Sequence, residues 1–184
     1  MIKRIFFVFI LTLFINNSYA KENIMILKLK NGDVLIELFD EIAPKHVERF
    51  KLLVKEKKYD GVVFHRVIDG FMAQTGDVQF GNSTLESYDI QRAGTGGSKY
   101  PDLKAEFSDI PHDRGTLSMA RSNDPNSANS QFFICFKSAP HLDRQYTVFG
   151  KVIKGMEFVD LIKRGEGSNG AVENPDKIIS LTAN

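Results

Sequence analysis

The sequence predicts an all-β domain with two helices, built as a sandwich or a barrel, and three observations support this fold class. Short apolar runs recur along the chain between Gly, Asn, Asp and Pro residues, a pattern typical of strands joined by turns. An Asn-Gly pair lies between two strand-like runs near the start, as in a β-hairpin. Only two segments have helical spacing, which is too few for a fold of alternating strands and helices.

The first pair of strands is expected at residues 24–30 and 34–38, on either side of Asn31 and Gly32. The first run ends in an alternation of leucine and lysine, which indicates one buried and one exposed face. Since Asn and Gly both tolerate positive φ, this pair favours a type I′ turn. The sequence therefore predicts a hairpin at the start of the domain.

The first helix is expected to begin near Pro44, since proline suits the first helical turn. Val47 and Phe50 follow at helical spacing, and His46 on the same helix is expected at the surface. A second, shorter helix is expected at residues 156–163. Further strands are expected at residues 62–67, 117–120, 131–135, 147–152 and 177–182.

Composition excludes several classes of protein. With 184 residues, 42% hydrophobic and 26% charged, the chain is an ordinary globular domain, neither disordered, collagen-like nor coiled coil. A single cysteine cannot form an intramolecular disulfide or a multi-thiolate metal site. A net charge of +1 offers no electrostatic footprint for nucleic acid, and the four histidines lack ligand spacing. We therefore expect neither nucleic acid nor metal as a partner.

The first twenty residues have the pattern of an export signal. Two basic residues are followed by an apolar run over residues 5–15 and by a small-residue cleavage site ending at Ala20. The run is shorter than the ~20 residues that span a bilayer, so a cleaved signal is favoured over a membrane tether. We expect a signal peptide at residues 1–20 and a mature domain at 21–184. Its expected location is the periplasm, with secretion or tethering as alternatives.

Several familiar chemical motifs can be dismissed. The glycine-rich segment 94–99 has Ser before Lys and Tyr-Pro after it, so it lacks the arrangement of a phosphate-binding loop. Ser118 lacks the Gly-x-Ser-x-Gly pattern of an acyl-transfer nucleophile. Cys135 ends an apolar run and is expected to be a buried, inert thiol.

One charged residue, Arg66, lies inside an otherwise apolar strand-like run. The chain turns after this run and re-enters with Phe71, Met72 and the amide of Gln74. Spacing leaves two interpretations open. Arg66 is either a solvated charge on an edge strand, or a cation set beside an apolar cup and oriented by Gln74.

Several blocks of sequence, in the same order, closely resemble the cyclophilin signature. They comprise residues 64–68, 70–72, 74–77, 94–97, 117–120, 129–135, 142–143 and 148–152. The resemblance extends from about Ile24 to Leu181. It implies a closed eight-stranded antiparallel β-barrel with a helix at each end. It also implies peptidyl-prolyl cis-trans isomerase activity without a cofactor.

The resemblance further implies roles for individual residues. Arg66 matches the catalytic arginine, Gln74 the amide that holds its guanidinium, and Phe133 an aromatic residue of the catalytic pocket. The residues implied to bind substrate are Phe71, Met72, Ala120, Arg121, Gln131, His141, Leu142 and Tyr146. Among these, Phe71, Met72 and Leu142 join Phe133 around the proline ring. Ala120 and Arg121 are implied to contact the peptide through backbone atoms.

The sequence also departs from the family pattern. His141 stands where the best-known members have Trp, Tyr146 replaces a common His, and Arg121 replaces a common Asn. About ten extra residues separate Asp77 from Gly94. We expect a monomer whose partners are proline-containing polypeptides, with weak cyclosporin binding in the same groove. The insertion and His141 keep an alternative open, namely a peptide-binding chaperone module with little turnover.

Overall fold

The computed structural model describes residues 23–184, so the expected signal peptide at 1–20 lies outside the described residues. The strands are β1 (Ile24–Leu29), β2 (Gly32–Leu38), β3 (Arg66–Ile68), β4 (Met72–Thr75), β5 (Thr116–Met119), β6 (Phe132–Cys135), β7 (Val148–Lys154) and β8 (Ser180–Ala183). The helices are α2 (Pro44–Lys55), α3 (Met156–Val159) and the one-turn 3-10 helix η1 (Pro140–Leu142). Between residues 23 and 184, no helix is long and apolar enough to cross a membrane.

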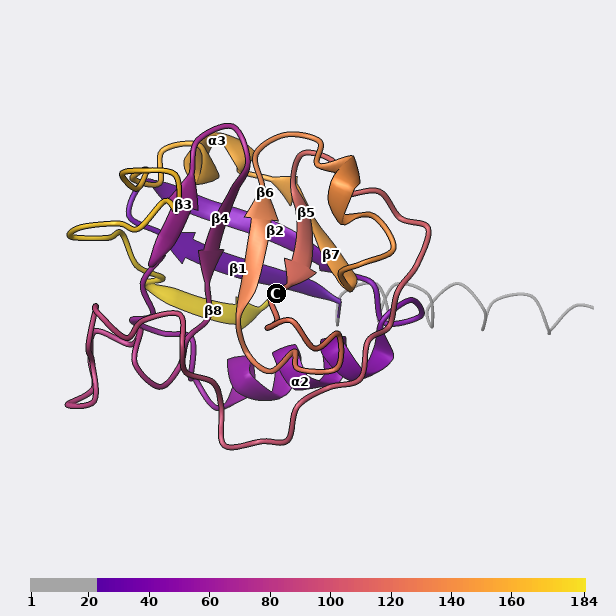
Figure 1. Ribbon diagram of the computed structural model, residues 1–184, viewed down its shortest axis with the longest axis horizontal. Helices are drawn as coiled ribbons and strands as arrows, with labels where there is room; N and C mark the ends of the chain where they lie inside the picture. Colours follow the sequence, from indigo (N-terminus) through magenta and orange to yellow (C-terminus); the bar gives the residue numbers. More distant parts are fainter. Residues whose placement is uncertain (1–22) are drawn as a thin grey trace, which may run out of the picture.

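The strands form one antiparallel sheet of eight strands in the order β3-β4-β6-β5-β7-β2-β1-β8 (Figure 1). This sheet is an open, curled half-barrel, so the predicted closed barrel is wrong. The edge strands β3 and β8 share no ladder within the described chain. Irregular segments lie between them and exchange isolated backbone hydrogen bonds, such as Phe64 N to Asp176 O at 2.9 Å and Ile178 N to Val62 O at 2.9 Å. Because these segments are not extended strands, the curl stays open there.

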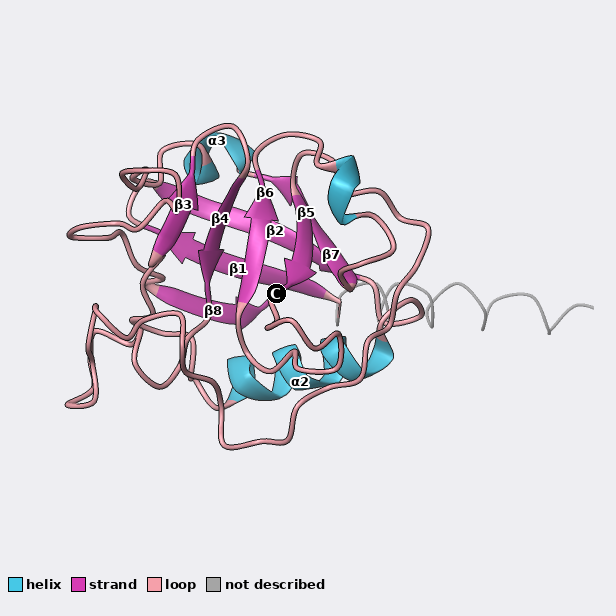
Figure 2. Cartoon of the chain, in the orientation of Figure 1, coloured by secondary structure: helices cyan, strands magenta, loops and turns pink. Residues whose placement is uncertain are grey.

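The main hydrophobic core lies inside the curl of the sheet. Phe50 of α2 packs against Phe132 of β6 and Phe149 of β7, with ring centroids 5.3 Å and 5.1 Å away. Tyr59, just after α2, completes this aromatic cluster at 5.2 Å from Phe50. The two helices lie at opposite ends of the sheet (Figure 2). The all-β prediction with two helices is therefore confirmed.

The hairpin between β1 and β2 forms, but its predicted turn is wrong. Leu29 pairs with Gly32, so the loop residues are Lys30 and Asn31. Neither has positive φ, which a type I′ turn requires. Gly32 is instead needed because a side chain there would lie 2.4 Å from the ring of Phe158.

Helix α2 begins at Pro44 as expected, but His46 is buried rather than exposed. Its Nδ1 lies 2.7 Å from Oε2 of Glu106, which also accepts hydrogen bonds from the backbone N–H groups of Lys45 and His46. Glu106 thus satisfies the first turn of the helix from a distant loop. Burial lowers the pKa of His46, opposed by its hydrogen bond to Glu106. Helical periodicity cannot reveal a partner that lies 60 residues away.

Helix α3 ends at Val159, four residues before the predicted end. Beyond it, Lys163 N donates to the Asp176 carboxylate and Gly165 N donates to Val67 O. These long-range bonds replace the helical ones, so the chain leaves the helix to run beside β3.

Candidate active site

The strand register brings the expected polar residues into one row on the face of the sheet away from the main core. Arg66 of β3 pairs with Gln74 of β4, and Gln74 pairs with Phe133 of β6. Residues directly opposite in antiparallel strands share a face, so these three side chains are neighbours. A second row on the same face consists of Ile68, Met72 and Cys135. The sheet therefore places a cation and an amide beside an apolar surface.

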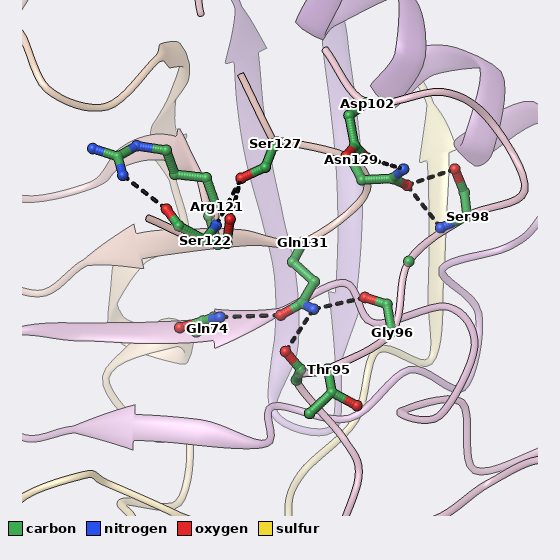
Figure 3. Close-up of a pocket in the computed structure, with 13 residues that line it drawn as sticks. Gln74, Thr95, Gly96, Ser98, Asp102, Arg121, Ser122, Ser127, Asn129 and Gln131 are labelled. Carbon is green, nitrogen blue, oxygen red and sulfur yellow. Dashed lines mark hydrogen bonds between the residues drawn. The ribbon is translucent and has the colours of Figure 1, made fainter. Parts of the chain in front are cut away.

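The Arg66 guanidinium is held by two acceptors. Its Nη1 donates to Oε1 of Gln74 at 3.2 Å, and its Nε donates to the carbonyl of Asn169 at 2.9 Å. Gln74 is held in turn, since its Nε2 donates to Oε1 of Gln131 at 3.1 Å (Figure 3). Partial burial lowers the pKa of Arg66, with Tyr146 acting in the opposite direction. The group remains a cation at neutral pH.

Next to this row, apolar side chains form a compact cup. Its members are Met72, Phe133, Cys135, Ala139 and Leu142, with Ile68, Phe71, Ala120 and Tyr146 packed against them. The ring of Tyr146 meets Phe133 edge-on at 5.9 Å, and the exposed His141 lies 5.4 Å from Phe71. Cys135 is fully buried as predicted, and burial raises the pKa of its thiol to about 12. The structure thus brings together every residue expected around the proline ring.

A cavity of about 500 Å³ lies beside the polar row and shares Ala120 with the cup. Figure 3 shows the residues that line it. Its lining is Gln74, Gly94, Thr95, Gly96, Gly97, Ser98, Asp102, Ala120, Arg121, Ser122, Ser127, Asn129 and Gln131. The Arg121 guanidinium stacks on the ring of Tyr146 at 4.4 Å and donates to Gln145 O. Its side chain is therefore part of the site, in addition to the backbone contacts expected from the sequence.

Sequence reasoning missed Asn169, whose carbonyl fixes Arg66 from a loop 103 residues away. No local pattern indicates this contact, because any residue offers a backbone carbonyl.

Three further residues form a chain that resembles a hydrolase triad. His112 Nδ1 lies 2.9 Å from Asp143, and its Nε2 lies 3.0 Å from Ser118 Oγ. Hydrogen bonds from the backbone and ring of His112 lower the pKa of Asp143. However, Ser118 is fully buried and its hydroxyl donates to Thr147 O at 3.0 Å. A nucleophile must be exposed to its substrate, so Ser118 is not placed to act as one. The three hydrogen-bonded residues instead have a structural role, since the His112 ring stacks behind Phe133 at 6.2 Å.

His65, beside Arg66, makes stability depend on pH. Burial lowers its pKa to about 4, opposed by the charge of Asp77. The unfolded pKa is about 6.5, so the folded state binds fewer protons between these values and stability falls as pH falls through this window. We expect the free energy of unfolding to drop from pH 7 to pH 4.5 by about 2 kcal/mol from this residue. Denaturant titrations at both pH values measure it.

The control for this prediction is His65→Phe, an aromatic residue that cannot take up a proton. Titration of the carboxylates and of His46 is common to both proteins and cancels in the comparison. Equal losses of stability in wild type and His65→Phe would contradict the assignment.

Comparison with known proteins points to one family. The family model described as cyclophilin type peptidyl-prolyl cis-trans isomerase/CLD matches residues 24–183. A protein of Brucella suis biovar 1 (strain 1330), named "Probable peptidyl-prolyl cis-trans isomerase", is 64% identical over 162 residues, covering 88% of this chain and 82% of the relative. Peptidyl-prolyl cis-trans isomerase-like 3 of Gallus gallus is 47% identical over 136 residues, covering 72% and 77%.

Solved structures agree with these relatives. A cyclophilin from Hirschia baltica superposes with a TM-score of 0.75 at 28% identity, covering 89% of this chain and 74% of that one. A cyclophilin type peptidyl-prolyl cis-trans isomerase from Cryptosporidium parvum, crystallised in the presence of the dipeptide Ala-Pro, gives a TM-score of 0.74 at 28% identity. The matched region covers 88% of this chain and 98% of that structure.

Proposed function

The chain belongs to the family of cyclophilin-type peptidyl-prolyl cis-trans isomerases, and on this premise we propose which of its residues perform the isomerisation and where it acts. Arg66 contacts the reacting amide, Gln74 orients Arg66, and Phe133 lines the cup with Phe71, Met72 and Leu142. The substrates are proline-containing polypeptides, and the presence of Ala-Pro with the Cryptosporidium parvum structure supports this class.

The reaction makes few chemical demands. Rotation about an Xaa-Pro bond is slow because amide resonance imposes a barrier of ~18–20 kcal/mol. No bond is made or broken, so the enzyme needs only to bind the twisted amide more tightly than either planar form. In the twisted state the proline nitrogen becomes pyramidal and gains a lone pair that accepts a hydrogen bond. A cation beside an apolar pocket meets this need.

The observation that supports the assignment is how the Arg66 guanidinium is fixed. Its two bonds occupy Nε and Nη1, which leaves Nη2 free of protein partners among residues 23–184. The apolar cup lies next to Arg66 on the same face of the sheet, so a proline ring in the cup would bring its nitrogen close to a guanidinium that is already oriented. Lowering the barrier by ~7 kcal/mol gives a rate increase of ~10⁵. The charge-assisted bond contributes part of this, and preorganisation the rest.

A protease-coupled assay on an Xaa-Pro tetrapeptide tests the proposed function against the alternative of a peptide-binding chaperone module. An isomerase accelerates cleavage of the cis fraction in proportion to enzyme concentration. A binding module protects the peptide or leaves the rate unchanged. Binding of the peptide without acceleration would refute the proposed role of Arg66.

We place the mature protein, residues 21–184, in the periplasm after removal of a signal peptide at 1–20. The support is the basic start, the short apolar run and the small residues before Lys21. Mass spectrometry of protein from the periplasmic fraction is expected to give an N-terminus at Lys21. A full-length chain retained with membranes would show a tether instead, and protein in the culture medium would show secretion.

His141 is expected to make the enzyme comparatively tolerant of cyclosporin. His141 lies beside Phe71 at the rim of the cup, where a tryptophan would offer a broader apolar face. Losing that face costs something like 1–3 kcal/mol, or a five- to hundred-and-fifty-fold weaker complex. His141→Trp should therefore bind cyclosporin more tightly, with little change in kcat/KM. Equal cyclosporin inhibition constants for wild type and His141→Trp would show that another feature, such as the insertion before Gly94, determines cyclosporin binding.

A further inference from the structure

Asp77, just after β4, is a buried carboxylate that the proposed reaction does not use directly. Its Oδ1 accepts hydrogen bonds from the backbone N–H groups of Gln79 and Phe80, at 3.0 Å and 2.9 Å. Its Oδ2 accepts from Gly94 and Gly96, at 2.8 Å and 2.9 Å. Four donors compensate the burial of one negative charge. Asp77 therefore ties together both ends of the segment that the sequence marks as an insertion.

The loop held by Asp77 allows no side chain at its glycines. Gly94 has φ of +100°, and a Cβ there would lie 2.9 Å from the ring of His65. A Cβ at Gly96 would lie 2.5 Å from Oδ1 of Asp77. The backbone of the loop thus rests directly on the two buried side chains, which fixes where its carbonyl groups point.

Those carbonyl groups determine the orientation of Gln131. Its Nε2 donates to Gly94 O at 2.9 Å and to Gly96 O at 2.8 Å, which uses both hydrogens of the amide. Only the oxygen is left to face Gln74, and it accepts from Gln74 Nε2. The oxygen of Gln74 must then face Arg66, where it accepts from the guanidinium. In this series of hydrogen bonds each residue donates to the next, from Arg66 through Gln74 and Gln131 to the glycine carbonyls.

Without the glycine carbonyls, the orientation of the two amides would be set only at the Arg66 end, by the guanidinium's need for an acceptor. A reversed Gln131 would present its NH₂ group to Gln74, and a reversed Gln74 would present NH₂ to Arg66. Two donors would then face each other, and the guanidinium would lose the acceptor that holds Nη1. Asp77 opposes this reversal from a distance. It holds the Gly94–Gly96 loop in place, and the carbonyl groups of that loop accept the hydrogen bonds of the Gln131 amide.

We propose that Asp77 is a positioning residue for the isomerase, acting through the Gly94–Gly96 carbonyls, Gln131 and Gln74 to orient the Arg66 guanidinium. This inference rests on the proposed function, since it requires Arg66 to contact the reacting amide. It assigns a catalytic consequence to Asp77, a buried residue that does not line the cavity itself.

The test is Asp77→Asn, which keeps the shape of the side chain but replaces an acceptor oxygen by a donor. At least two of the four backbone N–H groups then lose their acceptor. We expect kcat/KM to fall about tenfold, mainly through kcat, because Arg66 binds the twisted amide more strongly than the planar one. The protease-coupled assay is run well below the melting temperature of the variant.

The matched control is Asp89→Asn in the same insertion. Among residues 23–184, the Asp89 carboxylate accepts a hydrogen bond only from the backbone N–H of Gln91, at 3.0 Å, and this turn makes no bond to Gln131. Its kcat/KM should equal that of wild type. A loss as large as that of Asp77→Asn would show that any disturbance of the insertion reduces activity, and would overturn the inference.

A double-mutant cycle separates positioning from a merely structural role. If Asp77 acts through Gln131, Asp77→Asn should have no further effect on kcat/KM in a Gln131→Ala background. An undiminished tenfold effect there would overturn the inference.

Gly94→Ala provides a second route if Asp77→Asn does not fold. It displaces the Gly94 carbonyl while leaving the carboxylate in place, so a similar loss of kcat is expected. A folded Asp77→Asn or Gly94→Ala with full kcat/KM would overturn the inference, even where Arg66→Ala is inactive. An active Arg66→Ala would instead refute the proposed function.

Discussion

Arg66→Ala is expected to lower kcat/KM by roughly two to three decades, or ~3–4 kcal/mol of transition-state stabilisation. The loss should be large because Arg66 is the cation fixed beside the apolar cup, and its donors are oriented before substrate binds. The fold should survive, since the side chain is only partly buried and lies on the three-residue edge strand β3. The protease-coupled assay and circular dichroism measure the two effects separately.

Two further variants serve as comparisons for Arg66→Ala. Arg66→Lys keeps the charge but cannot engage two acceptors with one planar fork, so it should lose most of the activity as well. Arg164→Ala removes another arginine near the same hairpin, one that pairs with Asp69 at 3.0 Å and lies outside the cup. It should retain near-normal turnover. Turnover in Arg66→Ala equal to that of wild type would refute the assigned mechanism.

Phe132→Ala is expected to destabilise the protein by ~3–5 kcal/mol while leaving the chemistry of the site in place. Phe132 is fully buried and packs against Phe50, Tyr59 and Phe149. No neighbouring backbone can fill the space of an aromatic ring at the centre of the sheet. For a chain of this length, the melting temperature should fall by about 6–20 °C. Differential scanning calorimetry measures it.

The control is Phe107→Ala, the same substitution at a phenylalanine that is 44% exposed. It should change the melting temperature by only a few degrees. Below its own transition, folded Phe132→Ala should retain most of its kcat/KM, because its side chain faces the core and that of Phe133 faces the cup. Equal melting temperatures for the two alanine variants would contradict the packing described for Phe132.

Local features of the fold were predictable because their causes lie within a few residues. Pro44 and the apolar spacing after it predict helix α2, since both act within single helical turns. The hairpin of β1 and β2 was predictable for the same reason. The turn type was not predictable. Gly32 lies in strand β2 rather than in the turn, and a side chain there would collide with the ring of Phe158, more than a hundred residues further on.

Pairing of distant strands was harder to predict. A closed barrel followed from the resemblance to the family, but the edge strands are separated by irregular chain at residues 61–64 and 176–178. Backbone hydrogen bonds exist in either arrangement, so no residue type distinguishes a ladder from isolated bridges. The buried position of His46 was equally hidden, since it depends on Glu106 in a distant loop.

The residues of the candidate site could be named from their sequence blocks, because each block is short and contiguous. Whether Arg66 is an edge charge or an oriented cation could not be decided there, and the structure combines both interpretations. Arg66 lies on an edge strand, yet Asn169 and Gln74 hold its guanidinium beside the cup. The two hydrogen bonds that Asp77 accepts from the far end of the insertion were equally hidden from sequence reasoning, because they too join segments that are not adjacent in the chain. Composition and local spacing specify which side chains are present, whereas hydrogen bonds between remote segments specify where they point, and those bonds form only when the whole chain has folded.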